Sequence, residues 1–177
     1  MNPLQNSWVL YFHSFEEKSY SESSYIRLKK ISFIEDFGSL FRELSPKILN
    51  KGMFFLMKSN ILPIWEACEN KNGGFYSFKG NIEDIQKAYT EICMATTGGW
   101  LTTNNTINQV NGVSLNPRKH CVIYKIWSKS NKNIITFYNK IPFLNGKCIF
   151  SAHGEKKAEK RYEKKSRTSL DIKLKNK

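Results

Sequence analysis

Short apolar runs bounded by turn residues recur along the chain, and they predict strands. Residues 7–12 are β-branched and aromatic, and residues 25–31 alternate loosely between polar and apolar positions. Further runs of this kind lie at residues 53–57, 75–78, 112–115, 120–127 and 147–151. Because side chains alternate across a strand, we expect one face of the 120–127 strand to carry Cys121, Ile123, Lys125 and Trp127.

Two segments switch to helical spacing. Residues 33–44 place Phe33, Phe37, Leu40, Phe41 and Leu44 on one stripe, and Pro46 follows. The pattern Ser32-x-x-Glu35 matches a capping box, so we expect this helix to begin at Ser32. A second helix is predicted from residue 81 to about residue 96. Residues 131–141 fit a third helix or a strand about equally well.

Strands interleaved with two or three helices, without regular βαβ alternation, predict an α+β fold. An antiparallel sheet with its helices on one face is the natural arrangement. The 177 residues fit one domain, which we expect to span residues 1–154. Residues 155–177 carry ten Lys or Arg and four acidic residues and have no apolar stripe, which predicts a basic, flexible tail.

The net charge of the chain is +13, and the tail contributes +6 of it. Such an excess favours an acidic partner such as nucleic acid, a nucleotide or an anionic lipid, although solubility and biased composition would also produce it. No apolar run approaches the ~18 residues of a membrane span, and no secretory signal opens the chain. We therefore expect a cytoplasmic protein that does not use a membrane.

The residue patterns argue against a metal site, a cofactor or an enzyme. The four cysteines are widely spaced without a C-x-x-C pair, so we expect small, reduced core thiols. Motifs for phosphate loops and nucleophile elbows are lacking. A His120–Cys121 pair would not cooperate, because neighbours on a strand point to opposite faces. We expect a binding protein with no catalytic residues.

The loop sequence LPIWE (62–66) sets Trp65 directly before Glu66. An indole face attracts a cationic ring, and a carboxylate accepts two hydrogen bonds from the N1–H and N2–H2 edge of guanine. Methylation at N7 makes guanine cationic, so the pair is a plausible reader of 7-methylguanine. A core tryptophan beside a solvated glutamate would give the same two letters.

A second group of residues is suited to phosphates. Arg118, Lys119 and His120 precede the strand that carries Lys125 and Trp127. Basic groups that follow phosphates, interleaved with rings that stack on bases, are typical of single-stranded nucleic-acid binding. A basic surface turn is the alternative.

Several segments resemble the family of eukaryotic translation initiation factor 4E, the mRNA cap-binding protein. NPLQNSWVLYF (2–12) is similar to the family's opening H-P-L-Q-N-x-W-x-L-W, and LPIWE to its x-P-M-W-E. The other similar segments are FIEDF (33–37), ENKNGGFYSF (69–78), VNGVSLNPR (110–118) and IW (126–127). The resemblance implies a curved antiparallel sheet of about eight strands, about three helices on its convex face and a cap slot on its concave face.

The resemblance also implies roles for individual residues in binding the base. Trp65 matches the tryptophan that stacks on 7-methylguanine, Glu66 the carboxylate on the guanine edge, and Trp127 the tryptophan at the N7-methyl group. The family's second stacking tryptophan is missing. Tyr20 is the favoured replacement and Tyr25 the fallback, and we expect the exchange to weaken binding by on the order of 1 kcal/mol.

The implied phosphate contacts are partly replaced. Arg118 matches a phosphate-holding arginine, with Lys119 beside it. The family's phosphate lysine falls on Ile123, for which Lys125 on the same face could substitute. Its basic residue after the double glycine is here Phe75. Two further lysines lie near the family's C-terminal phosphate-reaching loop, Lys156 and Lys157.

The convex side departs most from the resemblance. There the family uses a helix tryptophan to dock the Tyr-x4-Leu-Φ helix of a 4G-type scaffold factor and of its inhibitors. That position is Gly38, whereas Pro3, Ile34 and Glu91 match the remaining contacts. Loss of a central indole typically costs more than ~2 kcal/mol, so we expect scaffold docking to be weakened or altered.

The leading hypothesis is a monomer that binds capped mRNA without a cofactor. One alternative is a cap-independent binder of single-stranded RNA. Another is a translational repressor or decoy with altered scaffold binding. Glu66→Ala should abolish cap preference under the first reading and change little under the second.

Overall fold

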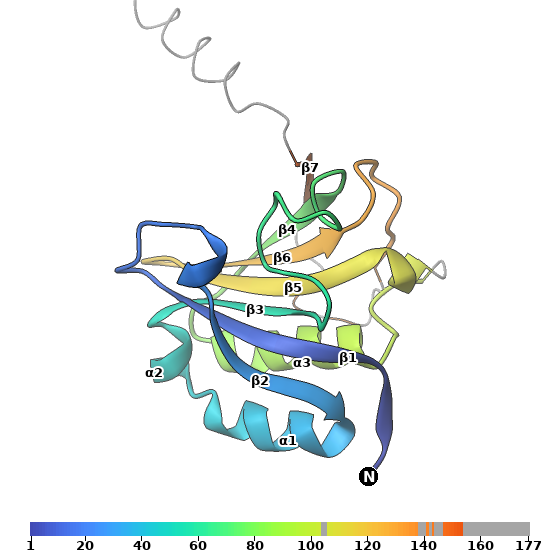
Figure 1. Ribbon diagram of the computed structural model, residues 1–177. Coiled ribbons are helices and arrows are strands. Elements are labelled where there is room, and N and C mark those ends of the chain that lie inside the picture. Colours follow the sequence, from blue (N-terminus) through green and yellow to red (C-terminus); the bar gives the residue numbers. More distant parts are fainter. Residues whose placement is uncertain (104–105, 138–140, 142, 144–146, 154–177) are drawn as a thin grey trace, which may run out of the picture.

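The protein is built on one curved antiparallel sheet. The computed structural model describes residues 1–103, 106–137, 141, 143 and 147–153. The described strands follow the order β2-β1-β3-β5-β6-β4-β7 (Figure 1). Their bounds are β1 Pro3–Ser14, β2 Ile26–Phe33, β3 Gly52–Lys58, β4 Gly74–Gly80, β5 Val110–Pro117, β6 Val122–Ser128 and β7 Ile149–Ala152. Seven strands are thus seen where about eight were expected, in the α+β arrangement that was predicted.

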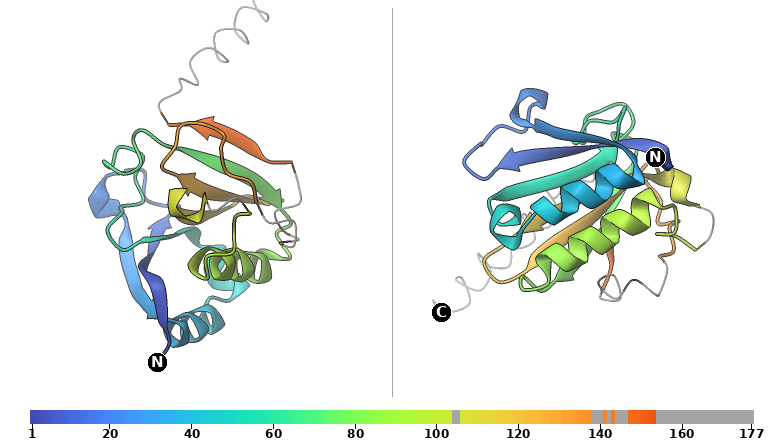
Figure 2. Two further views of the ribbon diagram at one scale, coloured as in Figure 1. Left: turned by 90° about the vertical axis from the view of Figure 1, so that its right-hand side faces the viewer. Right: turned by 90° about the horizontal axis from the view of Figure 1, so that it is seen from below.

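The helices lie on one face of the sheet, as expected. Figure 2 shows α1 and α3 side by side across that face, with α2 close to the end of α1. The helices are α1 Ile34–Glu43, α2 Pro46–Leu49 and α3 Ile85–Thr97, and short 3-10 turns occupy Glu22–Ser24 and Thr106–Gln109. The opposite face of the sheet is left to loops.

Two apolar clusters lie on the two faces of the sheet, because alternate strand residues point to opposite sides. The larger cluster packs the stripes of α1 and α3 onto the strands, through residues such as Phe41, Tyr89 and Leu115. The smaller cluster lies on the concave face and comprises Val9, Tyr11, Met53, Phe55, Met57, Ile61 and Trp127. This second cluster forms the base on which the candidate site is built.

The start of α1 differs from the predicted capping box. The helix begins after Phe33, and the carboxylate of Asp36 accepts hydrogen bonds from the backbone N–H groups of Ser32 and Phe33 at 3.0 and 3.1 Å. Glu35 instead accepts from the backbone N–H of Asn2 at 3.1 Å. The capping position is therefore shifted by one residue, because Glu35 is recruited to hold the N-terminal strand.

One of the two alternatives for residues 131–141 is wrong, and the third helix lies elsewhere in the chain. Within the described part of residues 131–141 there is no helix, only irregular chain with one isolated bridge between Thr102 and Phe137. α1 ends at Glu43, before Pro46, as the sequence indicated, and the third helix is α2, a single turn that begins at Pro46. Proline is compatible with the first turn of a helix, since the N–H it lacks has no partner there in any case.

All four cysteines are free thiols, but only Cys93 is a buried core residue, whereas Cys68 and Cys148 are exposed.

The expected basic tail, residues 155–177, lies outside the described residues. In the part of the chain that is described, every helix is too short or too polar to cross a membrane.

Candidate functional site

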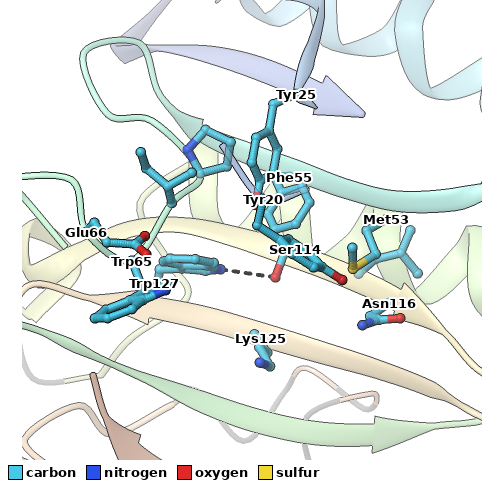
Figure 3. A pocket seen from close by; sticks show the side chains of 13 residues that line it. Tyr20, Tyr25, Met53, Phe55, Trp65, Glu66, Ser114, Asn116, Lys125 and Trp127 are labelled. Atoms are coloured by element: carbon cyan, nitrogen blue, oxygen red, sulfur yellow. Dashed lines mark hydrogen bonds between the residues drawn. The ribbon is translucent and has the colours of Figure 1, made fainter. Parts of the chain in front are cut away.

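A pocket of about 230 Å³ opens on the concave face (Figure 3). Its walls come from the chain before β2, from β3, from the loop after β3, and from β5 and β6. Of the predicted base-binding residues, all four line it, and Tyr25 and Lys125 do so as well. Segments up to about a hundred residues apart in sequence therefore meet at one site.

The loop after β3 presents Trp65 to solvent. Its side chain is 51% exposed, although indoles are normally among the more buried side chains. Glu66 is exposed beside it and also lines the pocket. The alternative of a core tryptophan is therefore wrong, and the ring offers a free face for stacking.

Trp127 forms a buried wall of the pocket. Its indole Nε1 donates a hydrogen bond to Ser114 Oγ at 3.0 Å, and its ring meets the edge of Phe55 at 6.2 Å between centroids. Only 8% of the side chain is exposed. Lys125 faces the same pocket, as the alternation along β6 predicted.

The two tyrosines that line the pocket differ in how exposed they are. Tyr20 is 60% exposed, and one face of its ring stacks on the buried His13 at 4.7 Å with 7° between the planes. Tyr25 is half-buried against the edge of Phe55 at 5.4 Å. Burial raises the pKa of Tyr25 to about 12, with smaller contributions from Tyr20 and Glu66. Tyr20 is the side chain whose exposure suits a stacking partner.

The candidate phosphate-binding cations are distributed unevenly. The ammonium group of Lys125 lies over the ring of Phe75, 4.0 Å from its centroid. Arg118 and Lys119 are exposed in the turn between β5 and β6 and do not line the pocket. The Asn116 amide is oriented so that both its oxygen and its nitrogen have hydrogen-bond partners, and its oxygen accepts from Arg118 Nη2 at 3.3 Å. This hydrogen bond links the turn to Asn116, which lines the pocket. Lys156 and Lys157 lie outside the described residues.

His153 packs against Trp127 and Phe75 but does not line the pocket. Its ring lies 5.3 Å from Trp127 and 5.5 Å from Phe75, and its backbone N–H donates to the carbonyl of Gly73 at 2.8 Å. Burial, followed by the nearby ammonium of Lys125, lowers the pKa of His153, against a smaller opposing effect of Glu66. The neutral form of this histidine is favoured.

On the convex face an apolar groove runs between α1 and α3. It is lined by Ile34, Phe37, Gly38, Phe41, Arg42, Gln86, Thr90 and Met94. A Cβ atom built at Gly38 would meet nothing within 4 Å, so the groove is open there. Pro3 is near one end, because Pro3 pairs with Phe33 directly before Ile34. Glu91 is half-buried on α3 and does not line the groove.

Several residues of the site had no distinctive signal in the sequence. Met53, Phe55 and Ser114 read only as strand residues, and His13 only as the first residue after the predicted strand 7–12. Their shared face becomes visible once the register is known: Phe55 pairs with both Tyr11 and Ser114.

Among the described residues no group of three His, Cys, Asp or Glu could hold a metal ion.

The sequence matches one known family over most of its length. The family model described as "Eukaryotic initiation factor 4E" covers residues 3–168. The chain is 26% identical over 148 residues to eukaryotic translation initiation factor 4E of Xenopus laevis, a match that covers 79% of this chain and 68% of the relative. The corresponding protein of Candida glabrata is 27% identical over 135 residues, and the match covers 73% of this chain and 64% of the relative. The chain thus spans about two thirds of the length of these relatives.

Solved structures show the same fold. Schistosome eIF4E complexed with m7GpppG and 4E-BP is 27% identical with a TM-score of 0.67, covering 75% of this chain and 74% of that one. Ascaris suum eIF4E-3 with the m7G cap has a TM-score of 0.70 at 17% identity, and the match covers 88% of this chain and 93% of that one.

Proposed function

Because the chain belongs to the eukaryotic initiation factor 4E family, we propose that it recognises the 7-methylguanosine 5′ cap of mRNA, by binding and without catalysis. The observation that carries the proposal is the exposed indole of Trp65 beside Glu66 at a concave aromatic pocket. The similarity to schistosome eIF4E, whose structure is described with m7GpppG, supports this choice of ligand.

The 7-methylguanine base would bind between two aromatic rings. Trp65 would stack on one face of the cationic 7-methylguanine, and Tyr20, backed by His13, would approach the other face. A ring–cation contact contributes about 0.5–2 kcal/mol, depending on how far it is desolvated. The Glu66 carboxylate would accept from N1–H and N2–H2, and Trp127, held by Ser114, would lie against the N7-methyl group.

The phosphates would be held by cations at the pocket and its edge. Lys125 lines the pocket itself and is the first candidate. Arg118 and Lys119 lie in the β5–β6 turn, beyond Asn116, where the phosphate chain or the next nucleotide would pass. Lys156 and Lys157 are proposed to reach the phosphates from the segment after β7. Such charge-assisted contacts weaken as salt rises.

The first experiment is quenching of tryptophan fluorescence by 7-methyl-GTP and, in parallel, by unmethylated GTP. We expect at least about ten-fold tighter binding of the methylated nucleotide, because only that ring is cationic when it stacks. Equal, weak and salt-sensitive responses would contradict cap recognition and favour general binding of single-stranded RNA.

The contact of Glu66 is tested by Glu66→Ala with 7-methyl-GTP and 7-methyl-ITP, which lacks the 2-amino group. The wild-type protein should prefer 7-methyl-GTP by about ten-fold or more, since a hydrogen bond to a charged group contributes about 1.5–3 kcal/mol. The variant should lose most of this preference. A variant that still discriminates between the two nucleotides would show that another group reads the edge.

We also propose that the convex groove docks a helical partner of the scaffold-factor class, more weakly than is usual for the family. The open space at Gly38 supports this, since a partner helix finds no indole there. Isothermal titration with a Tyr-x4-Leu-Φ peptide should show weak binding, and Gly38→Trp should strengthen it. Ordinary tight binding to the unaltered chain would refute the weakening.

A further inference from the structure

The loop that carries Trp65 is tied down by a fully buried amide. The Nδ2 group of Asn70 donates to the carbonyl oxygens of Leu62 and Ile64, at 2.9 and 2.8 Å. These two carbonyls lie in the three residues directly before Trp65. Since Asn70 has 0% exposure, the donor side of both bonds is shielded from water.

A second buried amide connects Asn70 to the sheet. The Nδ2 group of Asn111 donates to Asn70 Oδ1 and to the carbonyl of Glu69, both at 2.9 Å. Asn111 lies where the pairing of β5 with β6 shifts register, between Val110 and Gly112. Bulges next to binding sites commonly redirect a side chain. Here the irregularity coincides with the residue that reaches the loop.

The backbone of Asn70 completes the connection. Its N–H donates to the carbonyl of Ala67 at 2.8 Å, and its carbonyl accepts from the N–H of Gly73 at 2.8 Å. A Cβ atom at Gly73 would collide with the carbonyl of Ser128 at the end of β6, so the loop closes directly against the sheet. Asn70 thus joins the two ends of the loop on both sides of Trp65.

The chemistry of the pair favours a positioning role over simple packing. A primary amide supplies two donors and an acceptor on one plane, which neither an aspartate nor a leucine can do. Asn111 Oδ1 is buried without a hydrogen-bond partner among the described residues. A buried polar group of this kind costs stability, and an apolar residue would avoid that cost. The hydrogen bonds that Asn111 donates to the loop explain why an asparagine, and not an apolar residue, occupies this position.

We propose that Asn70 and Asn111 are positioning residues, which hold the loop of residues 61–73 so that Trp65 and Glu66 face the pocket before a ligand arrives. The proposal rests on the cap-binding function proposed above. A loop ordered in advance does not lose its conformational freedom on binding, so the ligand binds more tightly. Asn70 acts directly on the loop, and Asn111 acts through Asn70 and Glu69.

Binding of 7-methyl-GTP to the full chain tests the effect on affinity. We expect Asn70→Ala to raise the Kd by about ten-fold or more and Asn111→Ala by about three-fold or more, because the first variant loses both carbonyl contacts. Ile92→Ala, buried on α3 at the convex side, is the control for lost stability. It should leave the Kd within about two-fold at a temperature where all variants are folded. A folded Asn70→Ala protein with an unchanged Kd would overturn the proposal.

Hydrogen exchange provides a readout that does not depend on the ligand. In both asparagine variants the amides of Ala67, Asn70 and Gly73 should exchange about ten-fold faster, while those of β3 keep their protection. In Ile92→Ala the loop amides should be unaffected. Unchanged loop exchange in Asn111→Ala would overturn the proposal even if Asn70→Ala does not fold.

The two readouts separate failure of this proposal from failure of the proposed function. If the wild-type chain does not bind 7-methyl-GTP, cap recognition fails, and exchange still decides whether the asparagines hold the loop. The double variant provides a final check. Because Asn111 acts largely through Asn70, adding Asn111→Ala to Asn70→Ala should raise the Kd by less than Asn111→Ala does alone. Fully additive effects would refute the connection.

Discussion

The ammonium group of Lys125 lies over the aromatic ring of Phe75, 4.0 Å from its centroid. The two residues come from neighbouring strands, since Ser77 of β4 pairs with Lys125 of β6 and Phe75 pairs with Trp127. By resemblance to the family, Phe75 stands where a basic residue is usual, and the usual lysine position holds Ile123. The cation–π contact therefore joins one altered position, Phe75, to Lys125, which lies two residues beyond the other, and it keeps a positive charge at the pocket.

Replacing either member of this pair should weaken binding to different degrees. Lys125→Ala is expected to raise the Kd for 7-methyl-GTP about ten-fold, because a charge-assisted contact to a phosphate is lost. Phe75→Leu should raise it only about two- to five-fold, because the charge remains and its support is removed. Fluorescence titration at two salt concentrations measures both, with Lys47→Ala on α2 as the control. Equal affinities for all three variants would exclude Lys125 from the phosphate site.

The two tyrosines should respond differently to substitution. Tyr20→Trp is expected to tighten binding of 7-methyl-GTP about five-fold, because indole attracts a cationic ring more strongly than phenol does. Tyr25→Phe should leave the Kd within about two-fold, since the ring keeps its packing against Phe55. The same titration decides between them. A large loss in Tyr25→Phe would show that the Tyr25 hydroxyl contributes to binding, and an unchanged Kd in Tyr20→Trp would argue against Tyr20 as the second stacking residue.

Gly38 should be a site where stability can be raised. It lies inside α1, where glycine is less favourable than alanine by about 0.5–1 kcal/mol. Because a Cβ atom would meet nothing there, Gly38→Ala should increase the free energy of unfolding by about that amount. Urea unfolding measures it. Gly112→Ala is the contrasting control: its Cβ atom would collide with Met57 Sδ and the carbonyl of Leu56, so it should destabilise the protein.

His153 should make stability depend on pH just below neutrality. Its pKa in the folded state is lowered by burial and by Lys125 from the ordinary value of 6.5. As the pH falls below 6.5, the unfolded chain takes up a proton that the folded chain does not. The free energy of unfolding should therefore decrease until the pH reaches the folded-state pKa, and level off below it.

Urea unfolding of wild-type protein and of His153→Gln, at pH 7.5, 6.5 and 5.5, measures this effect. The variant should show a smaller decrease over this range. His120→Gln serves as the control, because His120 is exposed in the β5–β6 turn. An equal decrease in wild type and in His153→Gln would show that His153 does not contribute to the pH dependence of the free energy of unfolding.

The sequence by itself determined the strands, the stripes of α1 and α3 and the chemistry of Trp65 with Glu66. These features are local: side chains alternate along a strand and recur every three to four residues in a helix, whatever else the chain does. Composition also indicated the acidic partner. The resemblance to a family then predicted which residues contact the base and the phosphates, because the family's motifs lie within short segments.

Only the tertiary structure decided which distant residues meet. The sequence favoured Tyr20 over Tyr25, but the stacking of Tyr20 on His13 and the burial of Tyr25 could be known only from the fold. The cap of α1 shifted to Asp36 because Glu35 holds Asn2, a contact across 33 residues. Asn70 and Asn111 are 41 residues apart and read as loop and strand letters. Such pairings depend on sheet register and on the desolvation of polar groups, neither of which is a property of any one segment.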